Sequence, residues 1–128
     1  MSPVTQEWVD KAEEDFNVAL RESRARKFRS FNAVCFHAQQ CVEKYLKARL
    51  QEAGTAFPKT HSLPMLLNLA CVLEPLWSAL HPQAARLNVF AVAYRYPGTN
   101  ATKVEAKQAL ADCRLVRREA RVSLGLPV

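Results

Sequence analysis

An arginine between two tyrosines is the residue cluster of this sequence that is best suited to holding a phosphate. Arg95 lies between Tyr94 and Tyr96, and a Pro-Gly pair follows directly. A guanidinium can bind phosphate through two parallel hydrogen bonds, and tyrosine rings can stack on a nucleobase. The same arginine could instead pair with Glu43 or Glu105 and only stabilise packing. The residue types leave both interpretations open, and we expect Arg95 to belong to a polar site.

Two other segments could add charge to that site. Thr102 and Glu105 have the spacing of a capping box, so a helix is predicted to begin there. That helix would bring Lys103 and the positive end of its dipole toward the site, where both favour an anion. An earlier helix could add Lys47, or a counter-charge from Glu43, if it packs alongside.

Other chemistries find less support in the sequence. His37 and Cys41 are four residues apart and could share a metal ion, but no second pair of ligands has comparable spacing. With three glycines, the chain has no phosphate-binding loop and no nucleophile elbow. Asp15, Glu43 and Glu105 are predicted on polar faces, so we expect no pair of catalytic carboxylates inside a bundle. The sequence predicts no metal, no cofactor and no free-standing active site.

Hydrophobic periodicity predicts helices and no strand. The expected helices cover residues 5–24, 31–53, 63–73, 82–95 and 103–124. Thr5, Ser30 and Ser62 are the expected caps of the first three helices, the third continues irregularly past Pro75, and Pro97 ends the fourth. The predicted fold class is all-α, an up-and-down helical bundle of four to five helices.

The second of these helices has the strongest apolar pattern. Its apolar face is expected to be largely buried and includes Phe31, Val34, Ala38, Cys41, Val42 and Tyr45. Gln40, Glu43 and Lys47 fall together on the opposite side of the helical wheel, and we expect them outside the core.

The last predicted helix carries basic residues in a narrow stripe beside its apolar face. The stripe consists of Lys103, Lys107, Arg114, Arg118 and Arg121. Such a stripe either surrounds a core with snorkelling side chains or follows the phosphates of a nucleic acid. No aromatic residue interleaves the stripe, which favours the first interpretation.

The chain has 128 residues and a formal net charge of +6. The length favours a single domain, residues 1–128, and the charge suits an anionic partner without requiring one. No apolar run approaches the roughly 20 residues of a membrane-spanning helix, and no secretory signal is recognisable. The four cysteines lack C-x-x-C spacing. We therefore expect a cytoplasmic protein with reduced core cysteines and no membrane contact.

Three segments match the motifs of a known family in the same order. Residues 40–48 read Gln-Cys-Val-Glu-Lys-Tyr-Leu-Lys-Ala, residues 59–63 read Lys-Thr-His-Ser-Leu, and residues 95–97 read Arg-Tyr-Pro. They resemble the Q-x-x-E-K-x-L-K-A, K-T-H-D-L and R-Y-P motifs of the HEPN domain family, with serine in place of the usual aspartate in the second. The resemblance covers nearly the whole chain and implies about five helices, a homodimer, and nucleotide or RNA binding.

The resemblance also implies pairing with a minimal nucleotidyltransferase in a toxin–antitoxin-type module. Some family members are metal-independent ribonucleases with an R-x(4–6)-H motif. Counting from Arg95, the histidine would stand at position 100, 101 or 102, which hold Asn, Ala and Thr. The motif is absent, so we do not expect ribonuclease activity.

Three functional hypotheses follow. The first is a binding module for a nucleotide, RNA or a nucleotidyltransferase partner, and it is the function that we predict. The second is a variant ribonuclease that uses Arg95 with His61 supplied from elsewhere in a dimer. The third is a ligand-free dimeric scaffold.

Overall fold

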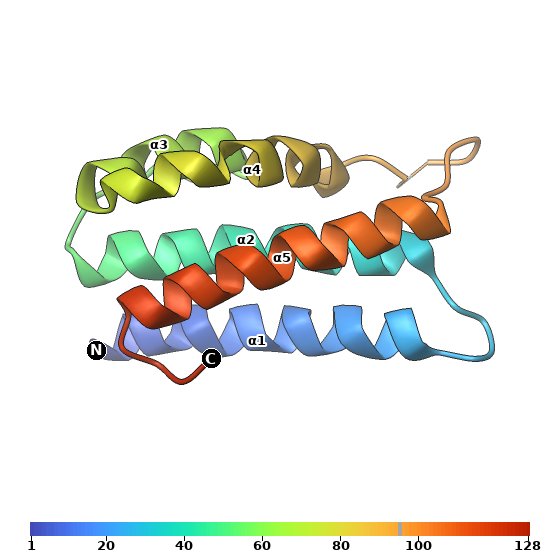
Figure 1. The fold of residues 1–128 in the computed structure, drawn as a ribbon, viewed down its shortest axis with the longest axis horizontal. Helices are drawn as coiled ribbons and strands as arrows, with labels where there is room; N and C mark the ends of the chain where they lie inside the picture. Colours follow the sequence, from blue (N-terminus) through green and yellow to red (C-terminus); the bar gives the residue numbers. More distant parts are fainter. Residues whose placement is uncertain (95) are drawn as a thin grey trace.

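A computed structural model describes residues 1–94 and 96–128 of the chain, and helices are the only regular elements in these residues. The elements are α1 (Pro3–Arg24), α2 (Phe31–Glu52), α3 (Leu63–Leu73), the 3-10 turn η1 (Pro75–Leu80), α4 (His81–Asn88), the 3-10 turn η2 (Val89–Ala91) and α5 (Lys103–Ser123). The long helices α1, α2 and α5 lie side by side, and α3 and α4 form a layer over α2 (Figure 1). The all-α prediction is confirmed.

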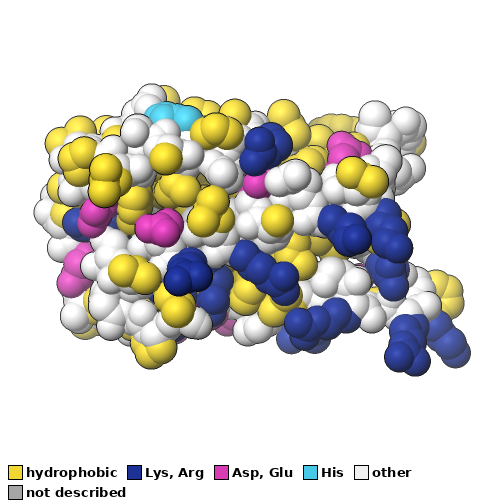
Figure 2. Space-filling view, in the orientation of Figure 1, with side chains coloured by type: hydrophobic (Ala, Val, Ile, Leu, Met, Phe, Trp, Pro, Cys, Tyr) yellow, Lys and Arg dark blue, Asp and Glu magenta, His cyan; other side chains and the backbone are white. Residues whose placement is uncertain are grey.

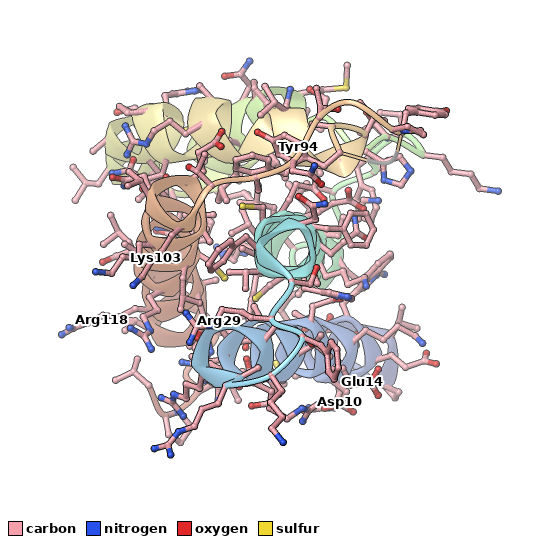
Figure 3. All side chains as sticks on the ribbon, turned by 90° about the vertical axis from the view of Figure 1, so that its right-hand side faces the viewer. Asp10, Glu14, Arg29, Tyr94, Lys103 and Arg118 are labelled. Carbon is pink, nitrogen blue, oxygen red and sulfur yellow. The ribbon has the colours of Figure 1, made fainter. Side chains whose placement is uncertain are left out.

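Helix α2 is the centre of the bundle. It packs against α1, α3, α4 and α5, and an end-on view shows α1 below it, α5 at one side, and α3 and α4 above it (Figure 3). Of the six residues predicted for its apolar face, five are fully buried and Phe31 is half-buried. Within residues 1–94 and 96–128, none of the helices combines the length with the hydrophobicity of a bilayer-spanning segment.

The prediction that Glu43 and Lys47 lie outside the core is wrong. Glu43 is 3% exposed and Lys47 is 7% exposed, although Val42 is also fully buried. A helical wheel assigns one side of a helix to solvent, whereas α2 has neighbours around most of its circumference. Asp15 of α1, also predicted on a polar face, is 7% exposed because it faces α2.

The helix caps are confirmed at Ser30, Ser62 and Thr102 and corrected at the first helix. There Ser2 is the N-cap, since its hydroxyl accepts a hydrogen bond from the backbone N–H of Thr5 and Pro3 stands at the first helical position. Thr5 is instead buried and its hydroxyl donates to Glu52 at the end of α2.

The fourth helix ends earlier than predicted. The α-helical part stops at Asn88, and Tyr94 adopts a left-handed φ of 66°, so the chain leaves the helix before Pro97. Two contacts favour this path. The Tyr94 ring stacks on Phe90 at 5.8 Å between centroids, and its hydroxyl donates to Glu105 Oε2 at 2.7 Å.

The central position of α2 predicts how strongly its apolar side chains stabilise the fold. Leu46→Ala, at a side chain that is 1% exposed, is expected to lower the free energy of unfolding by about 2–5 kcal/mol. Leu76→Ala makes the same chemical change at a side chain that is 89% exposed and is expected to cost less than about 0.5 kcal/mol. Urea unfolding measures both changes in the free energy of unfolding. Equal losses in the two variants would contradict the central position of α2.

Candidate phosphate-binding site

A cavity of about 320 Å³ lies at the end of the bundle where α5 begins. Its walls come from the end of α1, the loop before α2, the first residue of α2 and residues 103–114 of α5. We call it the basic cavity after its four cationic residues, Arg29, Lys103, Lys107 and Arg114. The three α5 residues share one helix face, because spacings of four and seven residues return to the same side.

The cations of the basic cavity have no acidic partner among the described residues. All four are exposed, and the side chains of Lys103, Lys107 and Arg114 make no hydrogen bond or ion pair there. Arg29 Nε donates to the backbone oxygen of Ala25 at 2.7 Å and otherwise lies over the Phe31 ring. The space-filling view shows Lys and Arg gathered at this end, where Arg29 and Lys103 project on the same side (Figures 2 and 3). An anion would relieve the repulsion between these charges.

A carboxylate of α5 itself, Glu105, already accepts a hydrogen bond at the N-terminus of this helix. Thr102 and Glu105 form the predicted capping box, with Glu105 Oε1 accepting from the Thr102 backbone N–H at 2.9 Å. This bond and the hydroxyl of Tyr94 hold the pKa of Glu105 below its usual range. An anion in this cavity would therefore meet the cationic side chains rather than the helix terminus.

The residues predicted to form one site lie in two places. Tyr94 and Lys103 are at the end with the basic cavity, and Tyr96 is 73% exposed. Arg95 lies outside the described residues. Glu43, Lys47 and His61 form a separate cluster on α2 and on the loop at the other end of that helix.

This second cluster, built around Glu43, fastens a loop to the central helix. Glu43 Oε2 accepts from Lys47 Nζ at 3.1 Å, and its Oε1 lies 2.9 Å from His61 Nδ1. Gln39 donates to both Glu43 and the backbone oxygen of His61, and Lys47 Nζ lies 5.4 Å from the Trp8 ring centroid. These contacts satisfy the hydrogen-bonding capacity of a buried carboxylate and hold the loop at His61 against α2.

Another buried carboxylate joins α1 to α2. Asp15 lies 2.7 Å from His37 Nδ1 and also accepts a hydrogen bond from Lys44. Burial by itself raises the pKa of Asp15, but the hydrogen bonds from His37 and Lys44 outweigh it and lower the pKa. His37 is therefore held by a carboxylate. Sequence reasoning missed this pair because only the packing of α1 on α2 brings the residues together.

A third network joins α1, α2 and α5. Arg117 holds Glu13 with two hydrogen bonds of 2.8 and 2.6 Å, and the buried Tyr45 donates to the same carboxylate at 2.6 Å. Arg121 donates to the Tyr45 hydroxyl at 2.9 Å. Arg121, predicted as part of the basic stripe, therefore contacts residues of the bundle itself. Three other residues of the stripe, Lys103, Lys107 and Arg114, have no such contact among the described residues and are accessible to a ligand.

The fold and this site define a small all-α bundle with a central polar helix and a cationic cavity at one end. A family model, the HEPN domain, matches residues 5–122. The chain belongs to the HEPN domain family.

A solved structure has the same fold. The crystal structure of an archaeal HEPN homologue is similar with a TM-score of 0.74 and 20% sequence identity, over 93% of this chain and 96% of that chain. At this identity the likeness describes the fold alone. A comparison with curated protein sequences gives no match.

The lowered pKa of Asp15 predicts a pH-dependent contribution to stability. A carboxylate whose pKa is depressed by folding stabilises the folded state above its unfolded pKa of about 3.9, and this stabilisation is lost as the pH falls through the folded-state value. Asp15→Asn is expected to cost roughly 3 kcal/mol near neutral pH. The difference between wild type and variant should shrink below about pH 4.

Thermal unfolding across pH measures this effect. Asp10→Asn removes a carboxylate from the exposed side of the same helix and is expected to change the stability little at neutral pH. A difference between wild type and Asp15→Asn that stays constant down to pH 2 would contradict the assignment.

Proposed function

We propose that this HEPN-domain chain binds the phosphates of RNA or of a nucleotide in the basic cavity. The observation that carries the proposal is the convergence of Arg29, Lys103, Lys107 and Arg114 on one cavity without acidic partners among the described residues. The retained family motifs support the same function, since the family resemblance implies nucleotide or RNA binding.

The dimensions and chemistry of the cavity suit this ligand. Small-molecule pockets commonly measure about 300–1,000 Å³, and 320 Å³ accommodates a group of nucleotide size. Arginine can hold a phosphate with two parallel hydrogen bonds, and lysine adds a mobile positive charge. Phe31 and Leu110 give the cavity an apolar wall beside these charges. Binding would release the counterions condensed on the nucleic acid, which adds a salt-dependent driving force.

The resemblance supports two further proposals, a homodimer and a minimal nucleotidyltransferase partner in a toxin–antitoxin-type module. Sedimentation of the purified chain tests the first, with a mass of two chains expected and a mass of one chain contradicting it. Co-purification with a nucleotidyltransferase encoded by a neighbouring gene tests the second, and separate elution of the two proteins would contradict it.

RNA binding is tested by removing two cations from the basic cavity. Lys107→Gln/Arg114→Gln is expected to weaken binding of a labelled single-stranded RNA in an anisotropy titration. The slope of log affinity against log salt should fall by about 1.4, since each contact with a single-strand phosphate contributes about 0.7.

The matched control removes the same charge elsewhere. Lys11→Gln/Lys59→Gln changes two exposed lysines that do not line the basic cavity, so net charge is equal in the two double variants. The control should keep the wild-type slope and most of the affinity. Equal losses in both variants would show a general charge effect, and no binding by the wild type would overturn the proposed function.

A further inference from the structure

A second cavity, of about 340 Å³, lies on the other side of the first turn of α2. It is lined by Asn32, Ala33, Phe36, His37, Ala93 and Tyr94, and we call it the His37 cavity. The first turn of α2 contributes to both cavities, because Phe31 lines the basic cavity and the next two residues line the His37 cavity.

Asn32 connects the walls of the two cavities. Its side-chain oxygen accepts from the Ala101 backbone N–H at 2.6 Å, and its amide nitrogen donates to Asn100 at 3.1 Å. These bonds hold the segment before Lys103 against α2. Tyr94 is held against the first turn of α5 by its hydrogen bond to Glu105. A ligand that occupies both cavities would meet surfaces whose relative position is fixed.

The hydrogen bond to Asp15 sets which nitrogen His37 offers to a ligand. Asp15 is an ionised acceptor, so the Nδ1 atom of His37, 2.7 Å away, carries the proton that it donates. In the neutral ring Nε2 is then an acceptor, and it has no hydrogen-bond partner among the described residues. A ligand group that complements it must present an N–H or O–H donor.

The other walls of the His37 cavity are mostly apolar or aromatic. Ala33, Phe36, Ala93 and Tyr94 line the cavity together with the imidazole of His37, and Asn32 is the other polar residue of the lining. A flat ring with N–H groups at its edge satisfies both features, since its faces contact the walls while its edge reaches Nε2. Nucleobases have this combination, and protein sites for unpaired bases use aromatic surfaces together with edge hydrogen bonds.

We propose that the His37 cavity binds an unpaired nucleobase of the RNA strand whose phosphate occupies the basic cavity. The inference rests on the proposed function, because the phosphate contacts bring the strand to this end of the bundle. His37 hydrogen-bonds the edge of the base, and Asp15 is a positioning residue that keeps the imidazole in the required tautomer. The ligand class is therefore a single-stranded ribonucleotide segment with at least one unstacked base.

The direct test compares two polymers that differ only in their bases. A short single-stranded RNA and an abasic ribose-phosphate chain of equal length are titrated into the full chain at matched salt. The RNA is expected to bind roughly tenfold more tightly, within the range for one base held against a protein surface. Equal affinities would overturn the base site and leave phosphate binding intact, whereas no binding of either polymer would overturn the proposed function as well.

A cavity-filling variant tests the location without disturbing His37 or Asp15. Ala33→Leu places extra volume in the His37 cavity, and Ala85→Leu makes the same change at an exposed position of α4. Ala33→Leu should reduce RNA affinity to that of the abasic chain while the affinity for the abasic chain stays unchanged. Ala85→Leu should behave as wild type, and full RNA affinity in Ala33→Leu would overturn the location.

A neutral nucleoside supplies an independent readout. Uridine, which has a base and no phosphate, should shift the imidazole NMR signals of His37 and leave those of His81 in place. Inorganic phosphate should leave the His37 signals in place. A shift of His37 with phosphate and none with uridine would contradict the proposed ligand.

Discussion

The burial of α2 on most of its circumference is the constraint on which the rest of this structure depends. A charged side chain on a buried helix costs several kcal/mol unless it is paired and hydrogen-bonded. Glu43 is therefore paired with Lys47 and His61, and Asp15 of α1 is paired with His37 and Lys44 of α2. These pairs form only in one register of the helices. The buried charged groups, which would destabilise the fold if unpaired, therefore also specify how α1 and the loop before α3 pack on α2.

Because the buried carboxylates pair within the bundle, the positive charges of the basic cavity have no acidic partner among the described residues. Glu13 and Asp112 are each held by an arginine within the bundle, through two hydrogen bonds in each case. The acidic side chains Asp10 and Glu14 lie on the side of α1 that faces away from Arg29 and Lys103 (Figure 3). The cations of the basic cavity thus face solvent together, and an anionic ligand is the partner that their arrangement favours.

Most of the fold was predictable from the sequence, because periodicity and capping residues are local signals. Ser30, Ser62 and the Thr102–Glu105 box mark three helix starts correctly. The early end of the fourth helix was not predictable, since it depends on the contact of Tyr94 with Glu105. Of the site, Lys103, Lys107 and Arg114 were visible as a stripe, whereas Arg29 and the Asp15–His37 pair required tertiary packing. The helical wheel misplaced Glu43 and Lys47 because it assumes a solvent side that a central helix lacks.

We propose that RNA binds at the end of the bundle where α5 begins. Amide NMR spectra of the isotope-labelled chain, titrated with a short single-stranded RNA, test it most directly. We predict that signals from residues 25–37 and from the first three turns of α5 shift together, while those of residues 53–62 at the opposite end of α2 stay in place. Shifts confined to residues 53–62, or no shifts at saturating RNA, would contradict the account.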